Sequence, residues 1–322
     1  MRYTLNYLLN SGFIKKEDSE KLNTAHLNKP FSIYWHVRLV LYLGVTLLSG
    51  GLGTIIYKNI DSIGHITIVT LIGLLSLSAL LYCYKKAPLF SVEKTEAPNP
   101  WLDYILLLGV TSFLTFEGYL QYQYDIFGTR YGLATIIPAL FLFYLSYRFD
   151  HLGVLTMAIT LFASWMGIAF TPKELMAAND FSELSLVSTG LSLSALLAVT
   201  GYFHSQKNIK AHFTFTYYNF ALHLGAIATW GATVSFDYGW VWMALLIPIV
   251  GLGYLYSMKE NSFYFLLISA IYGYIGVSYW FVQVLVLTDE LFMMYLLFFY
   301  FIVSAVFGLR FLRKAHKKMT AL

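Results

Sequence analysis

Ten apolar stretches, each close to 20 residues long, run through the 322-residue chain. A helix needs roughly 20 apolar residues to cross the hydrocarbon core of a bilayer, and backbone groups cannot be left unpaired in lipid. The strict alternation of barrel strands does not occur in these stretches. The sequence therefore predicts an all-α fold, a polytopic transmembrane helix bundle of about ten spans. The predicted spans are residues 36–57, 63–84, 101–122, 130–148, 151–170, 185–204, 213–235, 239–258, 261–286 and 291–311.

The composition agrees with a membrane protein. Hydrophobic residues make up 58% of the chain and charged residues only 12%, whereas about a quarter of the residues in a soluble domain are charged. The single cysteine, Cys83, excludes a disulfide within the chain. The lipid bilayer is thus the first partner that the sequence predicts.

The Lys and Arg residues predict how the chain is threaded. With the N-terminus in the cytoplasm, 18 of the 21 bases fall on cytoplasmic segments, and only Lys58, Arg130 and Lys173 fall outside. Bases are enriched on the cytoplasmic side of membrane proteins, and one span more or fewer would scramble this separation. Both termini are therefore expected in the cytoplasm.

Three parts are expected along the chain. Residues 1–35 are predicted to form a cytoplasmic helical hairpin, too small for a core of its own, that packs on the membrane domain or on a protein partner. Residues 36–311 form the ten-helix membrane domain. Residues 312–322 form a basic cytoplasmic tail, which is expected to lie on anionic lipid headgroups and not on nucleic acid.

The opening of the chain resembles a family of bacterial predicted membrane proteins that carry a domain of unknown function. The resemblance rests on the soluble stretch from Leu8 to Glu17, LLNSGFIKKE, and on the Gly- and Leu-rich first span from Leu43 to Gly53, LGVTLLSGGLG. Family members often have Asn-Trp after that span, whereas this chain has Asn59-Ile60. The resemblance covers about the first 90 residues. It implies a bacterial cytoplasmic (inner) membrane and brings no catalytic residues.

The search for reaction motifs is negative. The chain has no P-loop, no HExxH, no cysteine pair and no Gly-x-Ser-x-Gly elbow. Haem would need two histidines at matched depth on facing spans, and only His223 lies near the middle of a predicted span. No cofactor or metal is therefore expected, and an enzyme is less favoured than a protein without catalytic activity.

Polar side chains instead follow one face of each of three predicted spans. At about 100° per residue, the members of each set fall on a common side of an ideal helix. The sets are Asp103, Glu117, Gln121 and Tyr124; then Thr216, Asn219, His223 and Trp230; then Ser269, Tyr272, Gly276, Tyr279 and Gln283. All three spans are predicted to run from inside to outside. If these faces converge, they line a polar cleft that opens outward, because polar groups within a bilayer usually face the bundle interior or a water-filled cavity.

The predicted cleft consists of Glu117, Gln121, Asn219, His223, Tyr279 and Gln283. Simpler interpretations stay open for two of these residues. Glu117 lies in the outer third of its span, where it could reach the interface or, in its protonated form, donate a single interhelical hydrogen bond. His223 could bond to Asn219 and Thr216 on its own helix face.

Three functions are compatible with this pattern. The first is a transporter-like protein for a small solute or ion, since ten spans can form two five-span halves in inverted orientation. The alternative is a non-catalytic assembly, sensing or scaffold subunit that holds a partner through the N-terminal hairpin or the basic tail. The third is a lipid-modifying membrane enzyme with His223 or Glu117 as base, for which the spacing reveals no second catalytic group. The oligomeric state does not follow from the sequence.

Overall fold

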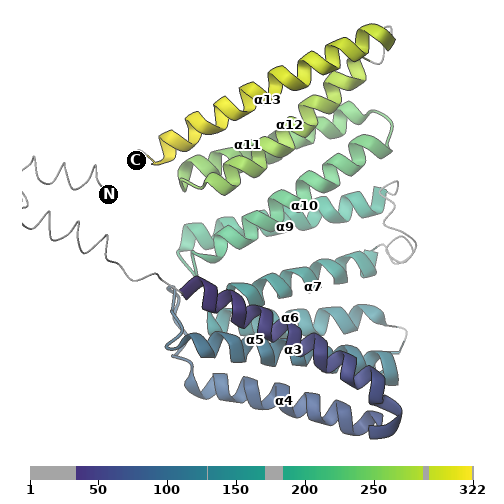
Figure 1. Ribbon diagram of the computed structural model, residues 1–322, viewed down its shortest axis with the longest axis vertical. Helices are drawn as coiled ribbons and strands as arrows, with labels where there is room; N and C mark the ends of the chain where they lie inside the picture. Colours follow the sequence, from purple (N-terminus) through teal and green to yellow (C-terminus); the bar gives the residue numbers. More distant parts are fainter. Residues whose placement is uncertain (1–33, 129, 171–183, 286–289, 321–322) are drawn as a thin grey trace, which may run out of the picture. The chain divides into compact units, whose positions relative to one another are not determined.

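The computed structural model describes residues 34–128, 130–170, 184–285 and 290–320 (Figure 1). These residues form ten α-helices and no β-strand, which confirms the all-α prediction. The predicted hairpin over residues 1–35 lies almost entirely outside the described residues. The helices are α3 Tyr34–Ile63, α4 His65–Lys86, α5 Pro100–Tyr124, α6 Tyr131–Phe149, α7 Leu152–Phe170, α9 Leu184–Lys207, α10 Phe213–Ser235, α11 Gly239–Lys259, α12 Phe263–Leu285 and α13 Glu290–Thr320.

Each predicted span corresponds to one of these helices. Seven of the described helices are long and apolar enough to cross a membrane: α3, α4, α6, α9, α11, α12 and α13. In α7 the apolar part, Leu152–Gly167, is shorter. Both α5 and α10 have ample length, with 25 and 23 residues, but they are more polar. Two of the three predicted polar faces lie on these two helices.

Local capping explains where several helices begin and end. Asn99 precedes α5, and its side chain accepts a hydrogen bond from the Trp101 N–H at 3.0 Å, with Pro100 at the first helical position. Asp150 ends α6 in a left-handed conformation, with φ 56°. The Val154 N–H then donates to Nδ1 of His151 at 3.1 Å, which caps the start of α7. The two residues Asp150 and His151 are therefore enough to connect α6 to α7.

The chain divides into two compact units, residues 1–59 and 60–322. In the second unit, consecutive helices pack as hairpins: α4 with α5, α6 with α7, α9 with α10, and α11 with α12. Helix α10 also packs against α11, and α13 packs against α12 (Figure 1). A core cluster of Leu155, Ile159, Leu193, Leu197, Phe213, Tyr217 and Ala221 joins α7, α9 and α10. Buried residues follow α10 along its whole length, so this helix is central to the second unit.

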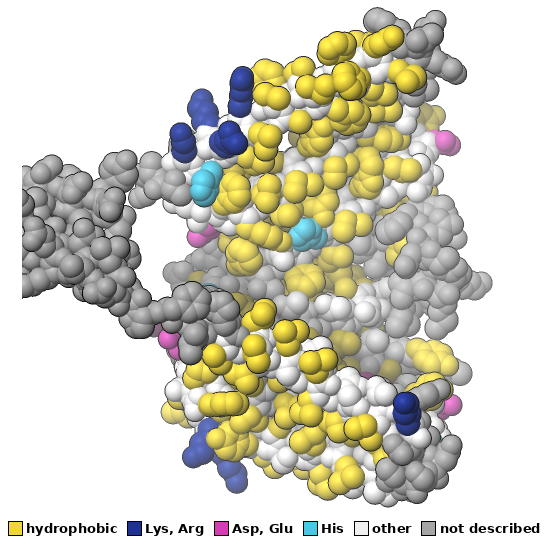
Figure 2. Space-filling view, viewed as in Figure 1, with side chains coloured by type: hydrophobic (Ala, Val, Ile, Leu, Met, Phe, Trp, Pro, Cys, Tyr) yellow, Lys and Arg dark blue, Asp and Glu magenta, His cyan; other side chains and the backbone are white. Residues whose placement is uncertain are grey.

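Apolar side chains also cover the outside of the helices, as the yellow surface in Figure 2 shows. Leu71 and Leu74 of α4 are 60% and 56% exposed, and Ile247 of α11 is 72% exposed. A soluble protein rarely exposes apolar surface on this scale. The membrane-spanning helices therefore have the lipid bilayer as their surroundings, and the protein is an integral, multi-pass membrane protein.

Candidate functional site

A hydrogen-bonded cluster joins the middle of α10 to α12. The hydroxyl of Tyr272 lies 2.7 Å from Nδ1 of His223, and the hydroxyl of Tyr264 lies 3.0 Å from Nε2. The Tyr264 hydroxyl also donates to Oδ1 of Asn219 at 2.7 Å. We call Asn219, His223, Tyr264 and Tyr272 the His223 cluster. It uses both ring nitrogens of an imidazole inside a predicted membrane span.

The hydrogen bonds define the tautomer of neutral His223. Because the Tyr264 hydroxyl gives its only proton to Asn219, it can only accept from His223, so Nε2 carries the ring proton. Nδ1 is then the acceptor, and the Tyr272 hydroxyl donates to it. Neutral His223 is thus fully bonded. A second proton can enter at Nδ1 if the Tyr272 hydroxyl turns from donor to acceptor.

Helix register explains why these residues meet. Asn219 and His223 are four residues apart and share one face of α10. Seven residues after His223, Trp230 packs against Tyr279 with ring centroids 5.1 Å apart. Tyr279 in turn follows Tyr272 by seven residues, so α10 and α12 keep the same register over two turns, as parallel helices do. The cluster is open on one side, because Tyr264 is 38% exposed and His223 is only half-buried.

The structure places the six predicted cleft residues in two regions. Asn219 and His223 belong to the cluster, Tyr279 lies on the same α10–α12 interface, and Gln283 is exposed farther along α12. Glu117 and Gln121 lie on α5, which packs against α4, α6 and α7. The grouping of all six residues around one outward-opening cleft stays a prediction.

The two residues on α5 have different surroundings. Gln121 is 8% exposed and bonds to the connection that follows its helix: its Oε1 accepts from the Phe127 N–H at 3.0 Å, and its Nε2 donates to the Gly128 carbonyl at 3.2 Å. Glu117 is half-buried, and its Oε1 is a buried oxygen without a hydrogen-bond partner among the described residues. Gln121 thus stabilises a connection, whereas Glu117 keeps an acceptor that the described chain does not use.

A second polar network joins α6, α9 and α10. His204 Nδ1 donates to the Thr200 carbonyl at 2.8 Å, so in neutral His204 the Nε2 atom accepts from the Tyr147 hydroxyl at 2.7 Å. The Tyr147 oxygen then accepts from Tyr217 at 2.7 Å. Each hydroxyl and ring nitrogen of this network has a hydrogen-bond partner, and Tyr147 and Tyr217 also pack in or against the apolar core cluster. Helix packing therefore explains the network without a bound ligand.

A third polar group, which we call the Asp150 cluster, ties three connections together at one end of the helices. Oδ2 of Asp150 accepts from Lys210 Nζ at 2.9 Å and from the Thr95 N–H at 2.5 Å. Oδ1 lies 2.5 Å from Nε2 of His212. Lys210 also donates to the Glu93 carbonyl at 3.2 Å. The segment between α4 and α5, the turn between α6 and α7, and the segment between α9 and α10 are therefore joined through one carboxylate.

Sequence analysis did not single out Tyr264, Asp150 or Lys210. Tyr264 lies two turns before Tyr272 on the same helix, and that spacing is a signal that could have identified it. Asp150 is an acid in a two-residue turn on the side of the membrane where bases are expected, which is unusual enough to suggest a local partner. The positions of Thr95 and Lys210 relative to Asp150 have no local sequence signal, because they are 55 and 60 residues away.

Comparison with known families adds one finding. Residues 7–155 match the family described as "Predicted membrane protein (DUF2157)". This match covers slightly less than half of the chain, and over these residues the chain is similar to the DUF2157 family. No curated protein and no solved structure matches the chain.

The DUF2157 match extends from before α3 to the first turn of α7. It includes Glu117, Gln121 and Asp150, whereas the His223 cluster lies beyond it. Within the described ranges there is also no group of three or more His, Cys, Asp or Glu side chains arranged to hold a metal ion.

Proposed function

We propose that the protein is a transporter-like membrane protein that moves a small solute or ion, with the His223 cluster as its polar centre and a proton exchanged at His223. The observation that carries this proposal is the imidazole near the middle of α10, bonded at both nitrogens by hydroxyls from α12. Ionisable side chains inside membrane spans are costly, and they commonly belong to ion pathways and proton relays.

The chemistry of the cluster is suited to such an exchange. A proton that enters at Nδ1 of His223 requires only rotation of the Tyr272 hydroxyl, whose oxygen then accepts from the imidazolium. The Asn219 and Tyr264 oxygens keep their bonds during this step. Tyr264 is exposed and is the second residue of α12, so the cluster is open near the end of this helix, where water or a solute would reach it. Protonation would change the charge next to any bound solute and so couple the two.

The proposed setting is the bacterial inner membrane, with ten spans and both termini in the cytoplasm. Two features of the fold support this topology. Helices α4, α6, α9 and α11, which are predicted to end inside, each carry Lys or Arg in the last turn, whereas α5 and α10 carry none there. The Asp150 cluster also joins three connections that are all predicted to be cytoplasmic.

A proton-flux measurement tests the proposal without knowledge of the solute. The full chain is reconstituted into liposomes that hold a pH-sensitive dye, and a potassium diffusion potential drives protons inward. We expect faster internal acidification than in protein-free liposomes. His223→Gln can still bond to both tyrosines but cannot titrate, so the flux should fall about tenfold or more. Tyr274→Phe is the matched control, because Tyr274 lies on the same helix but its hydroxyl bonds to Ser304 of α13 and not to the cluster, and this variant should keep the flux.

If liposomes with the wild-type chain acidify no faster than protein-free liposomes, the proposal is refuted. The same holds if His223→Gln leaves the flux unchanged. The assembly, sensing or scaffold hypothesis would then be the better account of the protein, because it requires no movement of protons. A lipid-modifying activity is the least supported of the three, since the described residues within hydrogen-bond reach of His223 are tyrosines, with no second acid or base.

A further inference from the structure

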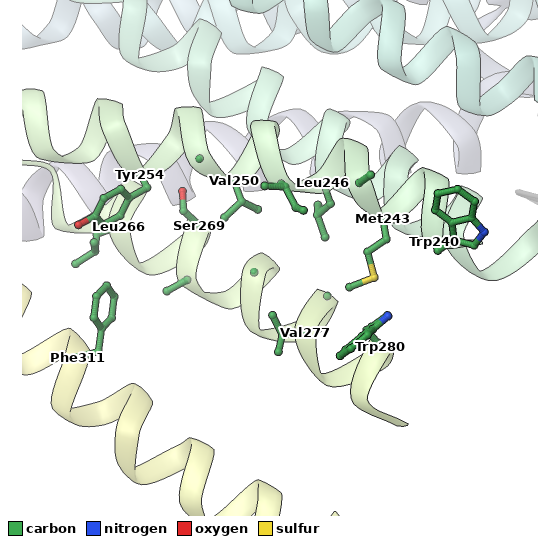
Figure 3. Close-up of a pocket in the computed structure, with 16 residues that line it drawn as sticks. Trp240, Met243, Leu246, Val250, Tyr254, Leu266, Ser269, Val277, Trp280 and Phe311 are labelled. Carbon is green, nitrogen blue, oxygen red and sulfur yellow. The ribbon is translucent and has the colours of Figure 1, made fainter. Parts of the chain in front are cut away.

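A groove of about 660 Å³ lies between α11, α12 and α13. Figure 3 shows that Trp240, Met243 and Trp280 lie toward one end of it, and Tyr254, Leu266 and Phe311 toward the other. None of the six predicted cleft residues lines this groove. Its lining is almost entirely apolar, so a polar solute is a poor occupant and a hydrocarbon chain is a good one.

The groove runs along the direction in which the helices cross the membrane. From Trp240 to Tyr254 the α11 helix advances by fourteen residues, which corresponds to about 21 Å at 1.5 Å per residue. This length covers most of one hydrocarbon core of about 30 Å. Trp and Tyr at the two ends are the residues that favour membrane interfaces. A lipid chain that lies in the groove would therefore keep the orientation that it has in the bilayer.

A glycine makes room for a ligand in the groove. A Cβ atom added to Gly251 would meet no atom within 4 Å, so the glycine faces open space in the groove. Ser269, in contrast, is only 1% exposed, and its hydroxyl has no hydrogen-bond partner among the described residues. Ser269 lies in the first third of α12, on the half of the groove nearer Phe311 (Figure 3). Because its hydroxyl oxygen is itself buried, it adds no accessible polar group to the groove, whose accessible lining stays apolar.

Positive charge lies at one end of the groove. Phe311 reaches the lining from α13, and Arg310, Arg313 and Lys314 are exposed on the same turn and the next. Figure 2 shows Lys and Arg side chains gathered at this end of α13. Because α13 continues without interruption to Thr320, the bases of the predicted tail belong to the helix that borders the groove. Basic clusters of this kind at the end of membrane helices bind anionic headgroups.

We propose that this groove is a binding site for one anionic phospholipid, with an acyl chain along α11 and α12 and the headgroup phosphate at Arg310, Arg313 and Lys314. The chain is recognised by apolar contact and the headgroup by charge. The site lies on the other side of α12 from the His223 cluster. The lipid-binding proposal therefore does not depend on the proposed transport.

Native mass spectrometry of the purified full chain tests the proposal. After delipidation, the chain is offered phosphatidylglycerol and phosphatidylcholine with the same acyl chains. We expect one tightly held phosphatidylglycerol per chain, with at least about tenfold preference over phosphatidylcholine. Gly251→Phe should fill the groove and remove this lipid. Gly118→Phe is the matched control, because Gly118 also has no atom within 4 Å of its Cβ but lies on α5.

A second variant tests the headgroup contact and leaves the groove unfilled. Gln at positions 310, 313 and 314 should abolish the preference for phosphatidylglycerol, whereas Gln at the exposed bases Lys85, Lys86 and Lys94 should preserve it. Three results would each overturn the proposal: equal retention of both lipids by the wild type, unchanged retention by Gly251→Phe, or unchanged preference in the triple variant at the end of α13. A wild-type dimer that Gly251→Phe converts to a monomer would also overturn it, since a second copy would then occupy the groove.

Discussion

Lys210 Nζ lies 2.9 Å from Asp150 Oδ2, and the two side chains are only 1% and 2% exposed to solvent. The two residues belong to connections that are 60 positions apart in the sequence. Removing charges from water is costly, so a pair this deeply buried is tolerated only when its remaining hydrogen-bonding groups are satisfied. Thr95, His212 and the Glu93 carbonyl provide those bonds. The pair therefore fixes how three hairpins meet at one end.

Asp150→Asn is expected to destabilise the protein by about 3–5 kcal/mol, because it leaves the Lys210 ammonium buried without an opposite charge. Asparagine also tolerates the left-handed backbone of Asp150, so the change tests the charge and not the turn. The measurement is the free energy of unfolding in mixed micelles. Lys94→Gln is the control: its ion pair with Glu96 is 3.7 Å long and exposed, and its loss should cost less than about 1 kcal/mol. Equal effects of the two changes would contradict the structural role of the buried pair.

Acidification is expected to destabilise the same cluster through His212. Burial lowers the pKa of His212 from its ordinary value of 6.5, and Lys210 and Lys94 lower it further, while Asp150 acts in the opposite direction. Burial has the largest effect, larger than the charge or the hydrogen bond of Asp150, and the net shift of the His212 pKa is downward. The unfolded chain therefore binds this proton more readily than the folded one, and stability falls as the pH drops below about 6.5. His212→Gln should reduce the loss of stability between pH 7.5 and 5, as measured by unfolding at each pH; an identical loss in both proteins would argue against this role.

The positions of the helices could be predicted from the sequence because apolar length is a local property. All ten predicted spans have a helix in the structure, including the short Asp150-His151 turn between α6 and α7. Length and hydropathy alone identify seven of them as spans, because α5 and α10 are more polar and the apolar part of α7, Leu152–Gly167, is shorter. The distribution of Lys and Arg residues predicts ten spans, which hydropathy alone does not.

The side-chain partners could be predicted only in part. Asn219 and His223 share a helix face by simple geometry, and Tyr272 was on the predicted polar face of its own span. The partners of Gln121, in contrast, are backbone groups of the connection between α5 and α6, whose conformation no helical periodicity describes. The Asp150 cluster depends on the packing of three hairpins, so its partners are set by the tertiary structure.

Gln121→Leu should loosen the connection between α5 and α6, because it leaves the Phe127 N–H and the Gly128 carbonyl without their partner. The expected cost is about 1 kcal/mol per lost hydrogen bond, because Phe127 is half-buried and Gly128 is exposed, so water can reach the groups that the change sets free. The readout is the rate of limited proteolysis within residues 125–130, together with the free energy of unfolding. Gln123→Leu is the matched control, since Gln123 is exposed on the same helix, and it should change stability by no more than about 0.5 kcal/mol. Comparable proteolysis of the two variants would assign Gln121 no special role.

The number of spans can be tested by three reporter fusions. A reporter that is active only in the cytoplasm is placed after Lys318 in one protein and within residues 171–183 in another. Five described helices, α9 to α13, separate these positions, so ten spans put them on opposite sides, with signal only from the C-terminal fusion. If only the seven strongly apolar helices cross the membrane, the chain crosses four times between the two fusion positions, through α9, α11, α12 and α13. Both fusions would then report the same side. A third fusion, before residue 34, separates the two arrangements again, because ten spans put both termini on one side and seven put them on opposite sides. Signals from the N- and C-terminal fusions and none from the middle one are what ten spans require, and any other combination rejects them.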